Sequence, residues 1–199
     1  MTWRFSLALL FQTLLILIVP AQAIYTRLSG QSAILQTVPV DPYDLLRGYY
    51  QTLRYEISRV EKLQSLPGWQ EILTLQLNGD KTLSIGTRFF VILQAPAAPQ
   101  RDERPPQPWL PVAVSRDRPE DLGSDRVALE GTYSEDGWVT YDLERYYLPE
   151  DQRFEINRRI QDLQSQPGQE RAFVVEVKID REGEAVPVRL WIGSRSYQF

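Results

Sequence analysis

Cysteine and histidine are both absent from this chain of 199 residues. Without cysteine there can be no disulfide, no thiolate nucleophile and no sulfur-ligated metal. Without histidine the chain lacks the commonest general base and the commonest transition-metal ligand. Catalysis would therefore depend on carboxylates, lysine, tyrosine or serine. We expect no metal and no cofactor.

Lysine is scarce as well, since arginine carries almost all of the positive charge and the only lysines are Lys62, Lys81 and Lys178. The formal net charge is −4, and acidic and basic residues are interspersed. A nucleic-acid-binding protein needs a concentrated basic face, which this pattern does not supply. We therefore expect no nucleic-acid partner, and we expect most charged residues to lie on solvated strand faces.

A long apolar segment opens the chain, running from Phe5 to Val19 after Arg4. Continued through Tyr25 it makes roughly 20 residues, or about 30 Å of helix, which just spans a bilayer. We expect residues 5–25 to anchor the chain in a membrane, with the N-terminus cytoplasmic and the bulk extracytoplasmic. A signal peptide cleaved after Ala23, which would release a secreted protein, is the alternative. Both interpretations export everything after Tyr25.

Three short segments recur later in the chain in the same order, which predicts an internal duplication. The matched segments are Arg54–Arg59 with Arg153–Arg158, Leu63–Gly68 with Leu163–Gly168, and Leu83–Arg88 with Leu190–Arg195.

Each half has the pattern of a strand, a short helix and a hairpin. In the first half, residues 49–57 alternate between apolar and polar side chains, as in a strand with one buried face. Ser58 and Glu61 have the spacing of a helix capping box, and Pro67-Gly68 would end that helix. Asn78-Gly79 then predicts a hairpin turn.

The second half repeats this order. Asn157 stands in the helix cap position. Residues 173–179 and 186–192 alternate on either side of Arg181–Gly183, which predicts a longer hairpin. A further hairpin is expected around Asp136-Gly137, between the two halves.

The expected fold class is α+β and strand-rich, with two related strand–helix–hairpin halves after one N-terminal apolar helix. Residues 44–199 are expected to form one compact domain. The predicted organisation is a transmembrane anchor or signal peptide at 1–25, a connector at 26–43, the first half at 44–95, a proline-rich linker at 96–111, an intervening hairpin region at 112–141 and the second half at 142–199.

The segment Gly48-Tyr49-Tyr50-Gln51-Thr52-Leu53-Arg54-Tyr55 resembles the signature of the GDYXXLXY protein family. Residues 39–47 and 144–150 resemble the lead-in and a second common segment of that family. The resemblance covers essentially the whole chain. It implies a membrane-anchored, extracytoplasmic (periplasmic) protein whose family has no established activity, with a polytopic membrane protein as a reasonable partner. The signature positions are Gly48, Tyr50, Leu53 and Tyr55.

The signature Asp is Tyr49 in this chain. If that Asp does chemistry elsewhere in the family, this member cannot do it in the same way. We interpret the signature residues as chiefly architectural, because neither repeated half carries a plausible nucleophile or ligand set.

Two enzymatic alternatives remain open. A Ser–Lys hydrolase would use Ser32 with Lys62 or Lys81 and would need the lysine to be desolvated beside the serine. A carboxylate-based hydrolase would need two acids held across a cleft. Its candidates are Glu130, Glu135, Asp136 and Glu144. A solvated hairpin that carries these acids on its surface is the simpler interpretation. Acidic residues at Asp80 and at Asp180–Glu182 do not have the spacing of a known calcium site.

Aromatic residues recur at matching places in the two halves. Core packing and cross-strand pairing explain them, and a carbohydrate or peptide platform is the alternative. They are Tyr49, Tyr50, Tyr55, Tyr146, Tyr147 and Phe154.

The leading hypothesis is a non-enzymatic, membrane-tethered interaction or scaffold module outside the cytoplasm. The alternatives are a hydrolase and a module that binds a small ligand or glycan in a cleft between the halves.

Overall fold

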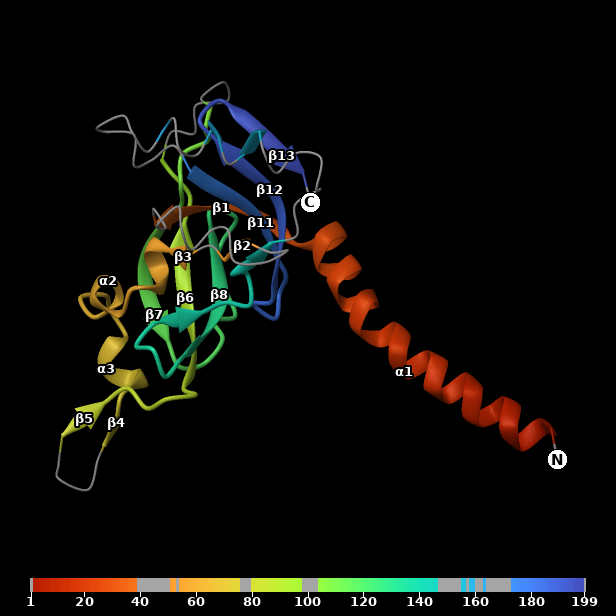
Figure 1. Cartoon of the computed structure of the whole chain (residues 1–199). Coiled ribbons are helices and arrows are strands. Elements are labelled where there is room, and N and C mark those ends of the chain that lie inside the picture. Colours follow the sequence, from red (N-terminus) through yellow and green to blue (C-terminus); the bar gives the residue numbers. More distant parts are fainter. Residues whose placement is uncertain are drawn as a thin grey trace.

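The structure is a computed structural model of the chain, and it describes residues 2–38, 51–52, 54–75, 80–97, 104–146, 155–156, 158–159, 163 and 173–198. Its helices include α1 (Thr2–Ser29), the 3-10 helix η2 (Glu56–Ser58), α2 (Val60–Leu63) and α3 (Trp69–Ile72). Its strands are β1 (Gln31–Val38), β2 (Gln51–Thr52), β3 (Arg54–Tyr55), β4 (Thr74–Leu75), β5 (Lys81–Thr82), β6 (Arg88–Gln94), β7 (Leu110–Ser115), β8 (Arg126–Tyr133), β9 (Val139–Thr140), β10 (Arg145–Tyr146), β11 (Phe173–Ile179), β12 (Ala185–Ile192) and β13 (Arg195–Gln198). The fold is therefore α+β and rich in strands (Figure 1).

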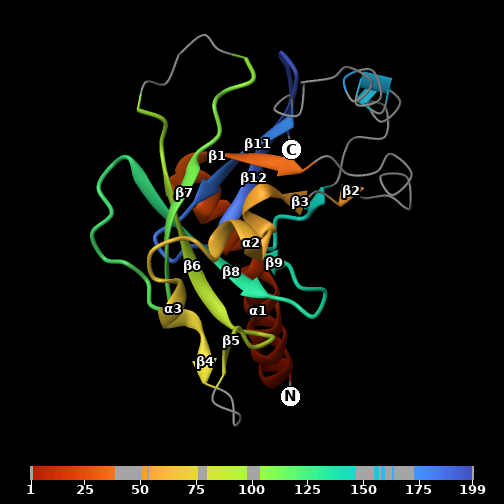
Figure 2. The same cartoon turned by 90° about the vertical axis from the view of Figure 1, so that its left-hand side faces the viewer.

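Two larger sheets form the body. One has five strands in the order β13-β12-β11-β1-β3, and the other has four in the order β7-β6-β8-β9. Short pairs join β10 to β2 and β4 to β5, and every strand pairing in the described residues is antiparallel. The strands of the two larger sheets run across one another (Figure 1), and α2 and α3 lie against β7 (Figure 2).

The core lies between these sheets because their strands alternate as a half-buried strand must. On β1, Ala33, Leu35 and Thr37 are buried while their neighbours are half-buried. Antiparallel pairing sets Ala33 opposite Val177 and Leu35 opposite Val175. These side chains join those of β6 and β8 in a single buried cluster.

Two predicted hairpins are confirmed. Strands β11 and β12 pair across the turn at Arg181–Gly183, and β8 pairs with β9 across Asp136-Gly137. The β11–β12 ladder shifts register between Glu176 and Val177, opposite Pro187. Proline has no N–H to donate to a ladder, so a bulge is the position at which an inner strand tolerates it.

The predicted capping box at Ser58 is wrong. Ser58 ends η2 and is buried, and the chain is extended at Arg59, with φ −81° and ψ 117°. Arg59 is therefore the N-cap of α2, without a side-chain capping bond, and Ser58 comes one residue too early.

The chain then passes close beneath β7. Gly68 has φ +86°, in the region that favours glycine, and starts α3, which the sequence did not predict. A Cβ at Gly68 would lie 1.9 Å from the carbonyl oxygen of Val114. Val114 in turn donates its N–H to the carbonyl of Pro67 at 2.9 Å.

The hairpins of the two predicted halves occupy different places. Strands β4 and β5 pair on either side of Asn78-Gly79, which lies outside the described residues, and they form a sheet of their own. The hairpin of the second half instead belongs to the five-stranded sheet. The internal duplication stays a prediction. In the proline-rich segment, Leu110 and Pro111 enter β7, which is an edge strand and tolerates proline.

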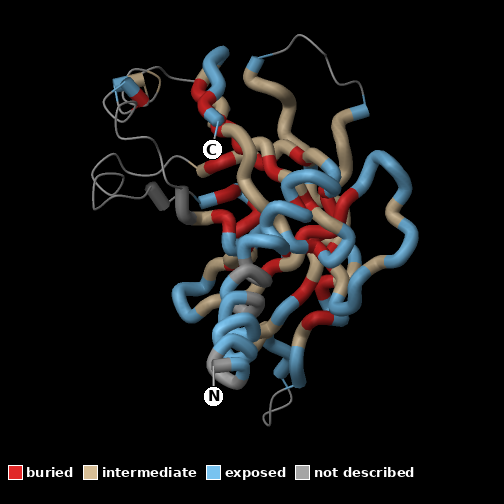
Figure 3. Tube along the Cα trace, turned by 90° about the vertical axis from the view of Figure 1, so that its right-hand side faces the viewer, coloured by how far each residue is buried: buried red, intermediate tan, exposed pale blue. Residues whose placement is uncertain are grey.

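Helix α1 projects away from the body, with its N-terminus at the far end (Figure 1), and Figure 3 shows the exposed residues along it. Large apolar side chains on it are more than half exposed, among them Leu7, Leu9, Leu10 and Phe11. Each residue of a helix turns about 100° from the one before it, so Leu7, Leu10 and Phe11 share one face while Leu9 points to the opposite side. In the stretches that the structure describes, we find no helix with the length and apolar character needed to cross a membrane.

Candidate functional site

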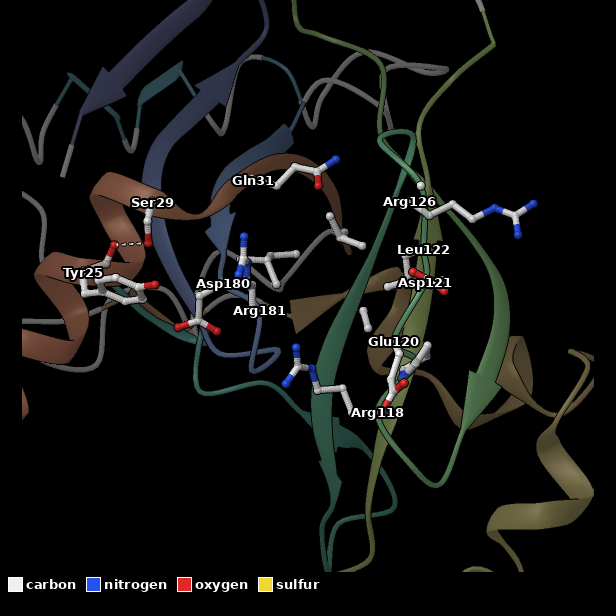
Figure 4. Close-up of a pocket in the computed structure, with 15 residues that line it drawn as sticks. Tyr25, Ser29, Gln31, Arg118, Glu120, Asp121, Leu122, Arg126, Asp180 and Arg181 are labelled. Carbon is white, nitrogen blue, oxygen red and sulfur yellow. Dashed lines mark hydrogen bonds between the residues drawn. The ribbon is translucent and has the colours of Figure 1, made fainter.

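A cavity of about 550 Å³ lies where α1 meets the body. Its walls are the last turns of α1, the start of β1, the loop between β7 and β8, and the turn between β11 and β12 (Figure 4). Its charged and hydroxyl-bearing lining residues are Tyr25, Ser29, Arg118, Glu120, Asp121, Arg126, Asp180 and Arg181.

A buried hydrogen bond helps to fix the helix to the body at the cavity. The hydroxyl of Thr26 is buried and donates a hydrogen bond to the Asp180 carboxylate, with 2.6 Å between Oγ1 and Oδ2. Gly30 then turns the chain from α1 into β1, and a Cβ there would lie 2.5 Å from the carbonyl oxygen of Thr26. The end of the helix and the start of the strand therefore have one defined arrangement.

Asp180 also shapes the turn between β11 and β12. Its Oδ1 accepts the backbone N–H groups of Glu182 and Glu184, each at 3.0 Å. With the bond from Thr26, this carboxylate already accepts three hydrogen bonds. Asp180 is thus a structural residue that holds the turn against α1.

The loop between β7 and β8 forms the opposite wall. Gln31, at the start of β1, donates from Nε2 to the carbonyl of Ser124 at 2.7 Å. At the other end of the loop, the hydroxyl of Ser115 donates to the carbonyl of Asp117 at 2.6 Å. Arg118 extends from this loop toward the turn that carries Asp180, whereas Arg126 extends away from it (Figure 4).

The cavity combines charges of both signs without neutralising them by direct contact. Three arginines and three carboxylates line it. Among the residues that the structure describes, no ion pair within 4.0 Å involves any of these six side chains. The arrangement can therefore present cationic donors and anionic acceptors to one bound group.

Of the signature residues, only Tyr55 is described, since Gly48, Tyr50 and Leu53 lie outside the described residues, as does Tyr49. Tyr55 is fully buried, and its hydroxyl donates to the carbonyl of Leu143 at 2.9 Å. Tyr55 therefore packs in the core and satisfies a buried backbone carbonyl there.

The same segment contains a buried tyrosine and a half-buried acid. Tyr141 donates its backbone N–H to the Glu144 carboxylate at 2.7 Å. Burial raises the pKa of Glu144 above its ordinary value, and the nearby Asp142 charge raises it further. Burial raises the pKa of Tyr141 well above 10, and the Glu144 charge adds to this. The backbone N–H of Tyr141 thus holds the Glu144 carboxylate in place.

Two arginines of the segment Arg54–Arg59 meet one tryptophan. The guanidinium carbon of Arg54 lies 4.4 Å from the centre of the Trp138 ring, and that of Arg59 lies 5.9 Å from it. Arg54 also pairs with Asp136 at 3.6 Å. The hydroxyl of Ser134 bonds to Asp136 and, with help from Arg54, lowers the pKa of that carboxyl. Asp136 thus holds the hairpin turn.

The predicted serine and lysines lie on separate elements. Ser32 is on β1, in the five-stranded sheet, while Lys62 is on α2 and Lys81 is on the isolated β4–β5 pair. The residue opposite Ser32 across the β1–β11 ladder is Lys178, which the Ser–Lys hypothesis did not consider.

The other predicted acids fit structural roles. Glu130 pairs with Arg88 across β8 and β6 at 3.2 Å. Glu135 lies in the exposed turn between β8 and β9. Within the described residues, no group of three or more acidic side chains is placed to hold a metal ion. Of the remaining aromatic candidates, Tyr147 and Phe154 lie outside the described residues, and Tyr146 belongs to β10.

Sequence reasoning missed the cavity at the base of α1. All of its charged residues except Arg126, the first residue of β8, stand in loops and turns, where a charged residue normally indicates only solvent exposure. The charge-rich run Arg116–Asp121 was visible in the sequence, but nothing there places it beside Tyr25 or Asp180.

Comparison with known proteins supports one assignment. Residues 12–190 match the GDYXXLXY family, described as GDYXXLXY protein, and the chain belongs to that family. No curated protein and no solved structure matches the chain.

Proposed function

We propose that this member of the GDYXXLXY family is a non-enzymatic interaction module that α1 attaches to a membrane, with its folded body outside the cytoplasm. The observation that carries the proposal is the apolar surface of α1. Leu7 and Phe11 are exposed on one face of the helix, while Leu9 and Ile16 are exposed on the opposite face. A groove on a soluble partner covers one face of a helix, whereas acyl chains surround it, so lipid fits this pattern better.

The buried link at the end of α1 supports a role in positioning. Thr26 and Asp180 connect the last turns of the helix to the turn between β11 and β12. A body joined in this way is presented to the membrane in one orientation. A polytopic membrane protein in the same bilayer is the partner that such a fixed presentation would suit.

The separation of the candidate catalytic groups supports a non-enzymatic role. Ser32 and Lys81 belong to different sheets, and Glu144 is bound to the backbone N–H of Tyr141. A hydrolase remains the second hypothesis. It predicts that Ser32→Ala or Glu144→Gln fails to complement a deletion although the variant protein folds and fractionates normally. The interaction hypothesis predicts that both variants complement the deletion.

Membrane fractionation of the full chain tests the attachment. Wild-type protein is expected in the carbonate-resistant membrane fraction, and Leu10→Lys with Phe11→Lys should shift it to the soluble fraction. Leu75→Lys with Ile85→Lys is the matched control, because these side chains are as exposed as the first pair but lie on the body. Equal release by both double variants would contradict attachment through α1. A mature N-terminus at Ile24 would instead mean that a signal peptide has been removed.

Crosslinking in intact membranes tests the partner. A photoreactive residue at Ser84, a half-buried position between β5 and β6, is expected to capture a polytopic membrane protein reproducibly. The same probe in the soluble Leu10→Lys, Phe11→Lys variant should lose that product. Identical products from both forms would show that the capture does not depend on the membrane.

A further inference from the structure

We propose that the cavity at the base of α1 binds the phosphoethanolamine headgroup of a membrane lipid, an inference that rests on the membrane attachment proposed above. The cavity lies beside Tyr25 and Ser29, in the last turns of the helix. If α1 occupies the bilayer, these turns lie at its surface, where lipid headgroups are found.

The rigid base of the helix keeps the cavity at that level. The Thr26–Asp180 hydrogen bond and the tight turn at Gly30 join α1 to both the β11–β12 turn and β1. Gln31 ties the β7–β8 loop to the same corner. Helix and cavity walls therefore move as one piece, so the insertion of α1 would bring the cavity to the headgroups.

The charges of the cavity select a ligand that carries both signs. Arg118 and Arg181 lie on facing walls, the first on the β7–β8 loop and the second on the β11–β12 turn. Guanidinium groups in such positions suit phosphate oxygens, with which arginine forms paired hydrogen bonds. Acidic side chains on the same walls disfavour a simple anion, because they repel it.

The acidic side chains supply the second half of the selection. Asp180 already accepts three hydrogen bonds, but Glu120 and Asp121 take part in no ion pair with described residues. A primary ammonium group can donate hydrogen bonds to them, whereas the methylated ammonium of phosphatidylcholine cannot. Phosphatidylglycerol has no cation to offer. At about 550 Å³ the cavity is within the size range of small-ligand sites.

Native mass spectrometry of the full chain in detergent tests the headgroup directly. Dihexanoyl phosphatidylethanolamine, phosphatidylcholine and phosphatidylglycerol are offered at equal concentrations, and bound lipid is counted. We expect phosphatidylethanolamine to be retained about tenfold more than either competitor, the effect of one charge-assisted hydrogen bond or more. Equal retention of phosphatidylcholine would overturn the proposal.

Paired variants test both halves of the site. Arg118→Gln with Arg181→Gln, and Glu120→Gln with Asp121→Asn, should each reduce this binding about tenfold. Matched charge changes elsewhere, Lys62→Gln with Lys81→Gln and Glu61→Gln with Glu71→Gln, should leave it unchanged. If the arginine pair matters but the acidic pair does not, the cavity is an anion site and the proposal is wrong. Competition by inorganic phosphate as effective as that by the lipid would assign the site to a free anion instead.

Flotation on pure phosphatidylcholine vesicles separates this proposal from the attachment itself. Flotation without headgroup selectivity in detergent would remove the headgroup site and leave the attachment standing. Selective binding in detergent without flotation would support the headgroup site and contradict the attachment, because the short-chain lipid reaches the cavity without insertion of α1. Circular dichroism melting of each variant confirms that the body is folded.

Discussion

The hydroxyls of Tyr55 and Tyr141 form two hydrogen bonds that link the segment containing Tyr55 and Ile57 to the segment containing Tyr141 and Leu143. The hydroxyl of Tyr55 donates to the carbonyl of Leu143 at 2.9 Å, and the hydroxyl of Tyr141 donates to the carbonyl of Ile57 at 2.6 Å. Each tyrosine thus satisfies a carbonyl just beyond the other. The last tyrosine of the family signature is in this way bound to a segment 88 positions away.

Replacing either tyrosine with phenylalanine should lower the free energy of unfolding by about 1–3 kcal/mol, because a buried carbonyl loses its partner while the ring remains. The double variant should cost less than the sum of the two, since both bonds join the same segments. Urea unfolding measures all three. Tyr25→Phe, at an exposed position of α1, is the control and should have little effect. Strict additivity would show that the two bonds act independently.

Glu144 should make stability depend on pH. Its folded pKa is raised by burial, so the folded form takes up a proton before the unfolded form as the pH falls. The cost of the buried charge is present above the raised pKa and disappears as the pH falls toward the ordinary value of about 4.5. As the pH falls from the raised pKa toward that ordinary value, the free energy of unfolding should therefore rise relative to that of a neutral variant.

Glu144→Gln is that neutral variant, because its amide oxygen can still accept the N–H of Tyr141. Unfolding at a series of pH values should find it more stable than wild type near neutrality, with the difference shrinking on acidification. Glu61→Gln, at an exposed position of α2, controls for the general loss of a negative charge. A constant difference between wild type and Glu144→Gln would contradict the raised pKa.

Gly68→Ala should be among the most destabilising single changes in the chain. The new methyl group would meet the Val114 carbonyl at 1.9 Å, and the positive φ adds strain of about 1–2 kcal/mol. We expect a loss of roughly 3 kcal/mol or more, because backbone must move as well. Gly137→Ala is the matched control, with φ +82° but no atom within 4 Å, and should cost only the strain. Similar losses of unfolding free energy at both positions would show that β7 can move away from the new methyl group without a measurable penalty.

Thr26→Val should loosen the base of α1, because it removes the bond to Asp180 while keeping the shape of the side chain. A buried hydrogen bond to a carboxylate contributes about 1.5–3 kcal/mol, so amide exchange in the last turns of α1 should accelerate at least tenfold. Thr26→Ser should restore protection. Thr13→Val is the control, since its hydroxyl bonds only to the carbonyl of Leu9 within the helix. Unchanged amide exchange in Thr26→Val would show that the Thr26–Asp180 hydrogen bond does not hold α1 against the body.

Local patterns predicted the elements whose cause is local. The hairpins at Asp136-Gly137 and Arg181–Gly183 follow from turn residues between alternating segments, and the structure confirms both. The Ser58 cap failed because Ser58 is buried at the end of η2, so the extended residue that precedes α2 is Arg59, which has no side-chain capping bond. The sequence did not predict that Arg54 and Arg59 contact Trp138. Pairing between β-segments brings these residues together, and their spacing along the chain does not reveal it.

The sequence by itself determined the strand-rich α+β character, the apolar first helix, the lack of thiol and imidazole chemistry and the family. Each of these depends on residue types or on near neighbours in the chain. Only the tertiary structure decided which sheet each hairpin joins, how Tyr55 is used and where a cavity forms. The walls of that cavity come from four segments between Tyr25 and Arg181, and only the packing of two sheets against one core brings residues so far apart in the chain together.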